Sequence, residues 1–272
     1  MTIGTHFVCI SLERARERRA LMARQFQAHG IDVQFFSGIE PRSPADAINE
    51  SDFSARMRRY GRPMSEGEIG CYLSHREVWK QLVDSGDDAW CIMEDDIALR
   101  SGFVATVWEL ASNRDHWDVV RLMGLNRNER IPYAKLPSGT QLMWMDRQPV
   151  GLQCYMLTRA GAAALLAHTH KIVHAIDTAV DRHWEHKLRL FVTEPEYVET
   201  VDMVSTVGFR PGITSLSMRV REKIYRRIDK TMAALYNAKR RPQRPIHLSQ
   251  NAIFTEHRQR DAHGLSLIDR QS

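Results

Sequence analysis

The chain has 272 residues, enough to bury a large core, and we expect one main domain with a peripheral appendage rather than two full domains. A hydrophobic content of 43% and a charged content of 26% are ordinary for a globular protein and exclude a collagen-like or largely disordered chain. The formal net charge of +5 favours anionic partners, namely nucleotides, lipid headgroups or nucleic acid, without choosing among them.

The compartment is predicted from the N-terminus, the apolar runs and the cysteines. The N-terminus lacks the pattern of a secretory signal, and no apolar run approaches the ~20 residues that cross a bilayer. The four cysteines are scattered without a C-x-x-C pair, which is typical of reduced core thiols. We therefore expect a cytoplasmic protein.

Strands and helices are predicted to alternate along the chain, which indicates an α/β layered fold. The main domain is expected to span residues 1–212, followed by a basic C-terminal helical extension over 213–272. In chain order we predict a strand over 6–12, a helix over 14–30, a strand over 33–40, a long loop with room for one short helix over 41–63, a helix over 66–83, a strand over 89–93, a helix over 101–112, strands over 117–124 and 150–158, helices over 159–170 and 175–187, and, within 188–199, a strand that Pro195 stops.

Three consecutive acids, Glu94, Asp95 and Asp96, directly follow the apolar strand over 89–93. If the strand continued, Glu94 and Asp96 would point to one side and Asp95 to the other, so two carboxylates could share one Mg²⁺ or Mn²⁺ ion. Ligands of open α/β sheets gather outside the carboxyl ends of strands, where these acids are expected. The alternative is that the acids cap the next helix or mark a solvated loop.

Four phrases, ISLERARERRALM, SEGEIGCYLSHREVWKQLV, CIMEDDIALRSGF and GLQCYMLTRAGAAALL, resemble glycosyltransferase family 25 in this order and spacing. That family includes bacterial lipooligosaccharide galactosyltransferases, and the resemblance covers about residues 6–210. It implies a GT-A-like fold with a mixed central sheet and flanking helices, a nucleotide-sugar donor that is usually UDP-linked, and inversion at the anomeric carbon. By the same likeness, Glu94 and Asp96 would hold the cation, with Asp96 as principal ligand, and Asp95 would contact the donor.

An inverting transfer also needs a base for the proton of the acceptor hydroxyl. Asp177 and Asp181 are four residues apart and would share a helical face, and the resemblance favours Asp177 because a similar Ile-Asp pair follows this helix in the family. Glu68 is a further catalytic candidate and His75 a donor-binding candidate, since both lie in the family-like phrase GEIGCYLSH. The alternatives are an N-cap for Asp177, a capping box between Ser65 and Glu68, and an ordinary helix histidine.

The nucleotide is expected at the end of the first strand. Ser11 and Leu12 would contact uridine through their backbone, and the guanidinium groups of Arg14 and Arg18 suit phosphate oxygens. The alternative is that both arginines belong to a solvated helix face. A loose group of histidines matches no zinc signature, although one of them could complete a metal shell. These are His168, His170, His174, His183 and His186.

Residues 218–244 carry ten Lys or Arg and two acids, a net charge of +8 that exceeds the excess of the whole chain. Ile224, Ile228, Met232 and Leu235 recur at helical spacing and would form an apolar stripe beside the cations. The stripe would either lie on an anionic membrane and bring the enzyme to a lipid-linked acceptor, or pack on the main domain. Nucleic-acid binding ranks low because no recognition motif accompanies the charge.

The sequence thus predicts a metal-dependent, inverting glycosyltransferase that uses Mn²⁺ or Mg²⁺. It would move a hexose, with galactose from UDP-galactose preferred, onto a lipooligosaccharide or related glycan. The first alternative is a nucleotidyl- or phosphotransferase with the same carboxylate-metal chemistry, which would release pyrophosphate rather than UDP. The second is a non-enzymatic basic adaptor for membrane or nucleic acid, in which the acids are structural.

Overall fold

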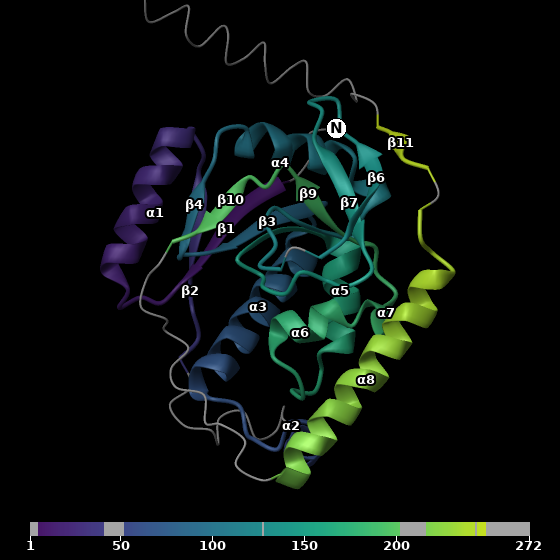
Figure 1. The fold of residues 1–272 in the computed structure, drawn as a ribbon. Helices are drawn as coiled ribbons and strands as arrows, with labels where there is room; N and C mark the ends of the chain where they lie inside the picture. The colour runs from purple at the N-terminus through teal and green to yellow at the C-terminus, as the bar shows by residue number, and fades with distance from the viewer. Residues whose placement is uncertain (1–4, 41–51, 127, 202–215, 243, 249–272) are drawn as a thin grey trace, which may run out of the picture.

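The computed structural model describes residues 5–40, 52–126, 128–201, 216–242 and 244–248. Its main feature is a nine-stranded mixed sheet in the order β11-β6-β7-β9-β5-β8-β3-β1-β2, beside which β4 and β10 form a small antiparallel pair (Figure 1). This sheet confirms the predicted α/β class. The strands are β1 Thr5–Ser11, β2 Val33–Ser37, β3 Ala89–Glu94, β4 Ile97–Leu99, β5 Val119–Arg121, β6 Arg130–Lys135, β7 Gln141–Met145, β8 Cys154–Thr158, β9 Leu190–Glu194, β10 Val198–Thr200 and β11 Ile246–His247.

Seven strands of the main sheet run in the same direction, namely β1, β2, β3, β5, β6, β9 and β11. Strand β1 pairs in parallel with β2 and β3, β8 runs antiparallel to both β3 and β5, and β5 is parallel to β9. The chain leaves β1 toward β2 on one side and returns to β3 on the other side. The gap between the ends of β1 and β3 is therefore a topological switch point, where open α/β sheets bind their ligands.

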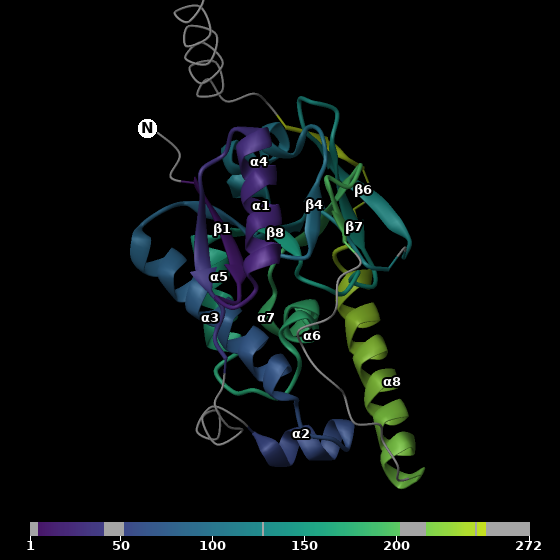
Figure 2. The same ribbon diagram turned by 90° about the vertical axis from the view of Figure 1, so that its left-hand side faces the viewer.

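Helices cover both faces of the sheet because side chains alternate along β1 (Figures 1 and 2). Phe7 and Cys9 belong to a core with α1 and α4, while Val8 and Ile10 belong to a second core with α3, α5 and α6. The helices are α1 Arg16–His29, α2 Phe53–Tyr60, α3 Glu66–Ser85, α4 Phe103–Ser112, α5 Arg159–His168, α6 Ile176–Asp181, α7 His183–His186 and α8 Leu216–Ala238, and Arg114–His116 form one 3-10 turn.

One predicted element is wrong in extent. The single helix expected over 175–187 is two helices, because Arg182 between them has a non-helical backbone and its side chain is buried against Glu185 and Asp229. The strand expected to stop at Pro195 is β9, which ends at Glu194, and the residues after the proline form β10, which pairs with β4 outside the main sheet. The short helix allowed for in the loop is α2, which Asp52 caps.

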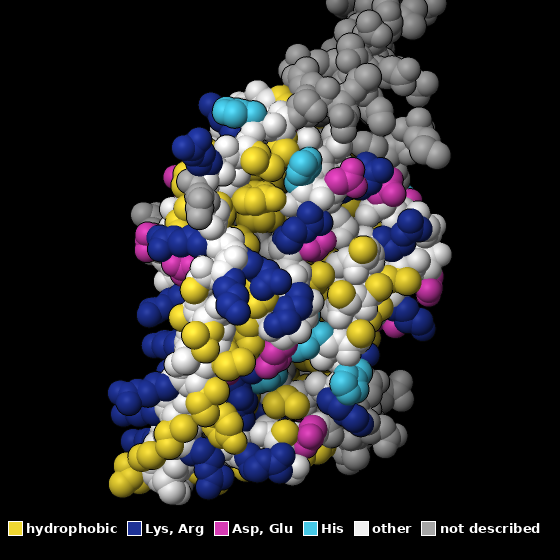
Figure 3. All heavy atoms as spheres, turned by 90° about the vertical axis from the view of Figure 1, so that its right-hand side faces the viewer, with side chains coloured by type: hydrophobic (Ala, Val, Ile, Leu, Met, Phe, Trp, Pro, Cys, Tyr) yellow, Lys and Arg dark blue, Asp and Glu magenta, His cyan; other side chains and the backbone are white. Residues whose placement is uncertain are grey.

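Helix α8 lies along the outside of the molecule, where it packs against α2 and α7 (Figures 1 and 3). The domain boundary predicted at residue 212 falls outside the described residues. In the described part of the chain, no helix combines the length and the hydropathy that a membrane crossing requires.

Candidate active site

The switch point brings the first strand to the acids. Ser11 ends β1, Glu94 ends β3, and the register pairs Ile10 with Glu94. Just beyond, the Ser11 hydroxyl donates a hydrogen bond to Asp95 Oδ2 at an Oγ–Oδ2 distance of 2.5 Å, and both residues are buried. The end of β1 and the acids are therefore in direct contact through the Ser11 side chain.

Arg18 of α1 supplies the positive charge of this site. Its Nη2 atom lies 2.6 Å from Asp95 Oδ1 and 3.4 Å from Asp96 Oδ2, and only 13% of its side chain is exposed. Arg18 is therefore not on a solvated helix face. The strict alternation expected for the three acids ends at Glu94, because β3 stops there and one guanidinium contacts both following carboxylates.

Arg14 and Leu12 stand at the margin of this cluster. Arg14 is exposed, and its Nε donates to the Glu40 carboxylate at 2.7 Å. The Leu12 carbonyl accepts a hydrogen bond from the Ala15 N–H at 3.0 Å, and the Ser11 carbonyl accepts from the Gly38 N–H at 3.0 Å. Both carbonyls therefore shape the turn after β1, which leaves uridine contact by these two residues a prediction.

The raised pKa of Asp96 and its carboxylate oxygen, which is unpartnered in the described part of the chain, are the properties expected of a metal-binding carboxylate. The pKa of Asp96 is raised to about 6, chiefly by burial and also by the negative charges of Glu94 and Asp95, against the opposing charge of Arg18. The Oδ1 atom of Asp96 is buried and has no hydrogen-bond partner among the described residues. Burial without a donor is costly for a carboxylate oxygen, and an oxygen-seeking divalent ion would satisfy it. The residues present thus fit a metal.

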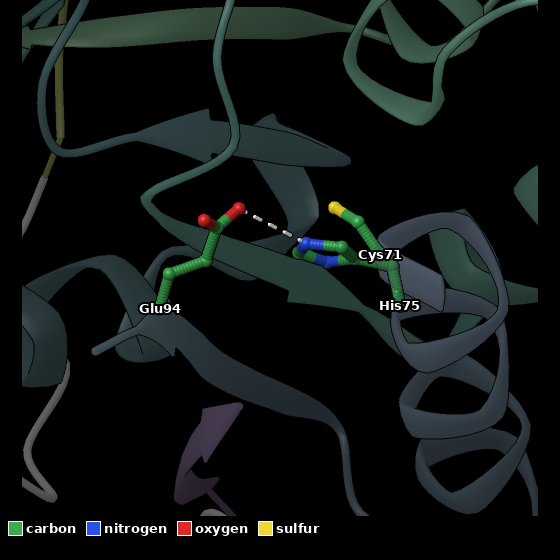
Figure 4. Close-up of side chains that lie close together, drawn as sticks. All are labelled: Cys71, His75 and Glu94. Atoms are coloured by element: carbon green, nitrogen blue, oxygen red, sulfur yellow. Dashed lines mark hydrogen bonds and ion pairs between the residues drawn. The ribbon is translucent and has the colours of Figure 1, made fainter. Parts of the chain in front are cut away.

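Glu94 belongs to a second set of potential ligands. Cys71 and His75 lie four residues apart on α3 and face Glu94 at the end of β3 (Figure 4). One ligand atom from each lies within 4.8 Å of the others, and this is the one such group of three among the described residues. Sulfur, nitrogen and oxygen donors together favour a softer ion such as Zn²⁺ over Mg²⁺.

His75 is held by a buried chain of hydrogen bonds that sequence analysis missed. The Trp79 indole N–H donates to the Tyr155 hydroxyl oxygen at 2.7 Å, that hydroxyl lies 2.8 Å from His75 Nδ1, and His75 Nε2 lies 3.3 Å from Glu94 Oε1. Because an indole only donates, the Tyr155 hydrogen is available to Nδ1, which leaves the His75 proton on Nε2, toward Glu94. The chain thereby orients Glu94. In the sequence, Trp79 and Tyr155 are indistinguishable from ordinary core aromatics.

The two aspartates of α6 have different surroundings. Asp181 Oδ1 accepts a 2.5 Å hydrogen bond from the buried Arg121, whose Nε also donates to the Gly151 carbonyl at 2.9 Å. Burial raises the pKa of Asp181 to about 6 although Arg121 lowers it. Asp177 accepts from the Thr178 N–H at 2.6 Å and is not the N-cap, which is Ala175. Asp181 is thus tied to a structural cation, and Asp177 is the less committed of the two.

Glu68 closes the predicted capping box of α3. Its carboxylate accepts from the Ser65 N–H at 2.9 Å, and its own N–H donates to the Ser65 hydroxyl at 3.1 Å. The Arg62 Nη1 atom lies 3.5 Å from the same carboxylate. These partners favour the structural interpretation of Glu68 over the catalytic one.

The histidine group is bonded to protein atoms. His174 Nδ1 lies 2.6 Å from the Tyr60 hydroxyl, and His183 Nε2 lies 2.9 Å from Asn237 Oδ1. Burial lowers the pKa of His174 to about 2 and that of His186 to about 4, so both are neutral near pH 7. These contacts favour a structural role for His174, His183 and His186, whereas His170 is exposed on the surface.

The chain is similar to a known protein family and to several of its members. The family described as Glycosyltransferase family 25 (LPS biosynthesis protein) matches residues 5–180, more than half of the chain, and this range contains every site residue above except Asp181. A Glycosyltransferase 25 family member of Aedes aegypti is 34% identical over 124 residues, which cover 43% of this chain and 20% of that protein.

Two named relatives are similar over shorter or weaker alignments. Procollagen galactosyltransferase 2 of Homo sapiens is 26% identical over 170 residues, 58% of this chain and 26% of that protein. The Lacto-N-neotetraose biosynthesis glycosyltransferase LgtB of Neisseria meningitidis is 35% identical over 94 residues, 34% of this chain and 33% of that protein. The alignments thus span a third or less of each of these relatives. The match over residues 5–180 shows that the chain belongs to glycosyltransferase family 25.

Proposed function

We propose that this chain is a GT-A-like, metal-dependent, inverting glycosyltransferase that transfers galactose from UDP-galactose to a hydroxyl of a lipid-linked oligosaccharide or related glycan. Membership of family 25 and the activities for which its relatives are named support the transfer of a sugar. The main support for the proposed metal site is the acid cluster at the switch point. In this cluster, one buried carboxylate oxygen of Asp96 has no hydrogen-bond partner among the described residues.

The donor is proposed to lie across the ends of β1 and β3. Arg18 holds Asp95 and Asp96 in place from one side, and the exposed Arg14 at the rim can contact diphosphate oxygens. A divalent cation bound by Glu94 and Asp96 would supply charge stabilisation to the departing diphosphate. The Trp79, Tyr155 and His75 chain would keep the Glu94 carboxylate turned toward the ion.

Proton transfer is assigned to Asp177. As the acceptor oxygen bonds to the anomeric carbon and the bond from that carbon to the UDP oxygen breaks, the hydroxyl proton passes to the Asp177 carboxylate. Asp181 and Glu68, the other two candidates, already hold Arg121 and the start of α3. Asp181 instead positions the turn before β8, because Arg121 joins it to the Gly151 carbonyl.

The test is a panel of UDP-sugars and GDP-mannose offered with Mn²⁺ or EDTA, with slow donor hydrolysis as the readout. We expect UDP release from UDP-galactose, abolished by EDTA, and a loss of about 100-fold in Asp96→Ala. The control is Asp84→Ala, which removes an exposed acid from the end of α3. Release of pyrophosphate would favour a nucleotidyltransferase. Activity that is unchanged both by EDTA and by Asp96→Ala would refute the metal role of the acids.

The same assay separates the two ligand sets that share Glu94. Cys71→Ser removes the sulfur donor, whereas Asp96→Asn replaces a carboxylate of the other ligand set by a neutral amide. If Glu94 and Asp96 hold the ion, Asp96→Asn raises the Mn²⁺ concentration needed for half-maximal activity and Cys71→Ser leaves it within about twofold. The reverse order would place the ion at Cys71 and His75.

A further inference from the structure

Helix α8 leaves a row of large apolar side chains in solvent. Six aliphatic residues that follow one another at intervals of three or four positions are between 47% and 76% exposed. A monomer rarely leaves a continuous apolar row of this length uncovered. The row, here called the α8 stripe, consists of Leu216, Val220, Ile224, Ile228, Met232 and Leu235.

The stripe is exposed because a different face of α8 is attached to the domain. Asp229 forms ion pairs with Arg59 of α2 and with Arg182, whose Nη1 lies 2.8 Å from Asp229 Oδ1. Tyr236 and Asn237 are buried, and Asn237 Nδ2 donates to the Asp146 carbonyl at 2.8 Å. The alternative that the C-terminal helix packs on the domain is therefore confirmed, but the packing face is not the stripe that the sequence analysis expected. The helix is fixed with the stripe outward.

The charges of α8 indicate which kind of partner its exposed face can bind. All six of its Lys and Arg side chains are exposed, and Figure 3 shows such side chains beside the apolar band of α8 at the lower left. Both acids of the helix already have partners, since Glu222 accepts from Arg226 and Asp229 faces the domain. The six cations are Arg219, Arg221, Lys223, Arg226, Arg227 and Lys230.

We infer that α8 binds the surface of a membrane that contains anionic lipid, with the stripe in the interfacial layer and the cations at the headgroups. An apolar row bordered by cations matches such a surface in both hydropathy and charge. A second copy of the chain is a poorer occupant, because it would bring two rows of like charge together. Residues 216–238 lie outside the range that matches the family, so family membership does not account for this surface.

The inference does not depend on sugar transfer. It concerns where the protein lies, whereas the proposed function concerns the acids at the switch point. Because ion pairs join α8 to α2 and to Arg182, binding through the stripe would hold the catalytic edge at a fixed distance and angle to the lipid. That arrangement suits an acceptor carried by a lipid.

The experiment is flotation of the full chain with vesicles of phosphatidylcholine alone or mixed with phosphatidylglycerol. We expect binding to the anionic vesicles only, weakened by added salt. The triple change Ile224→Asn, Ile228→Asn and Met232→Asn is expected to reduce the partition coefficient by about tenfold or more. Since these side chains are half exposed, circular dichroism and the melting temperature should stay unchanged.

A matched pair of charge variants tests the role of the cations. Changing Lys223, Arg227 and Lys230 to Gln should weaken binding by about fivefold for each charge removed. Loss of the same charge at exposed positions on other elements should weaken binding far less. This control changes Arg24 of α1, Lys80 of α3 and Lys135 of β6 to Gln.

Three results would overturn the inference. They are equal binding to neutral and anionic vesicles or to neither, equal binding by the stripe variant and the unaltered chain, and equal weakening by the two charge variants. Light scattering measures the oligomeric state of the protein without vesicles. A dimer that the stripe variant abolishes would show that the stripe binds a second copy of the chain and not a membrane. Donor hydrolysis is measured in parallel and should be unaffected by the stripe changes, so a failure of the proposed function is distinguishable from a failure of membrane binding.

Discussion

Ser11 and Asp95, 84 positions apart in the chain, share a 2.5 Å hydrogen bond that joins the ends of β1 and β3. The bond spans the point where the order of the sheet reverses, and Arg18 holds the second oxygen of the same carboxylate. Asp95 is thus a structural centre for the acids on either side of it.

A double-mutant cycle should measure this contact. We expect Ser11→Ala to lower the free energy of unfolding by about 1–2 kcal/mol, and the coupling between Ser11→Ala and Asp95→Asn to be about 1–3 kcal/mol, since the acceptor is charged and buried. Urea titration gives both quantities. Ser101→Ala, in the exposed turn before α4, serves as the control. Additive effects of the two changes would show that the hydrogen bond contributes nothing.

Tyr155→Phe should reveal the hydrogen-bond chain behind Glu94. The change removes one oxygen and leaves the buried Trp79 N–H and His75 Nδ1 unpaired, at a cost of about 2 kcal/mol. Donor turnover should fall while the melting temperature of the Mn²⁺-free protein records the loss of stability. In the control Tyr133→Phe, the ring that stacks on Phe191 is kept, and we expect a change below about 0.5 kcal/mol. Equal stability of the two variants would contradict the chain.

The buried histidines should make the protein sensitive to acid. Burial lowers the pKa of His186 to about 4, below its value in the unfolded chain, so the unfolded state takes up a proton first as the pH falls. The stabilising contribution is complete above about pH 6.5 and is lost progressively toward about pH 4. Between about pH 7.5 and about pH 5, the unaltered chain should lose about 1–2 kcal/mol more than His186→Gln, whose amide can still donate to the Val180 carbonyl.

The measurement is chemical denaturation at a series of pH values. Asp181 acts in the opposite direction, because its raised pKa gives a contribution that is complete below about pH 4 and lost as the pH rises through about 6. The comparison between variant and unaltered chain cancels this term. Parallel curves for the two proteins would mean that His186 is not held neutral.

The ionised Asp96 carboxylate should lower the free energy of unfolding of the metal-free protein, and a bound metal ion should offset this loss. The raised pKa of Asp96 means that the ionised carboxylate destabilises the metal-free fold above about pH 6, and this effect disappears below about pH 4. In EDTA at about pH 8, Asp96→Asn should therefore raise the free energy of unfolding by about 1 kcal/mol, a value reduced to allow for the partial exposure of the side chain.

Added Mn²⁺ should reverse that order. We expect the ion to raise the melting temperature of the unaltered chain and of the control Asp84→Asn more than that of Asp96→Asn, because binding to the folded state alone stabilises it. Differential scanning fluorimetry with and without Mn²⁺ is the measurement. An identical response in all three proteins would remove Asp96 from the metal site.

The elements around the site were predictable because their local signals agree. The apolar run before the acids correctly predicts β3, and the spacing of Ser65 and Glu68 correctly predicts the start of α3. The hairpin of β6 and β7 was missed, since Pro132 argues against a strand and the structure accommodates it by a shift of register between Pro132 and Ala134. A bulge of this kind depends on the partner strand and is not visible in the sequence.

Within the site, residue types were predictable and their pairing was not. The acids, Ser11 and Arg18 were singled out by position and chemistry, yet which carboxylate each would contact depends on where β3 ends. Arg121 could not be anticipated, because the partners of this buried cation, Asp181 and the Gly151 carbonyl, lie 60 and 30 positions later in the chain. Tertiary partners decide such cases.

Asp229 is shared by arginines from two elements, Arg59 of α2 and Arg182 between α6 and α7. Arg182 directly follows Asp181 in the chain, so pulling α8 away from the body would strain the segment that carries both α6 aspartates. The seating of the outer helix and the geometry of the segment that carries Asp177, the proposed base, are thus mechanically linked through a single carboxylate.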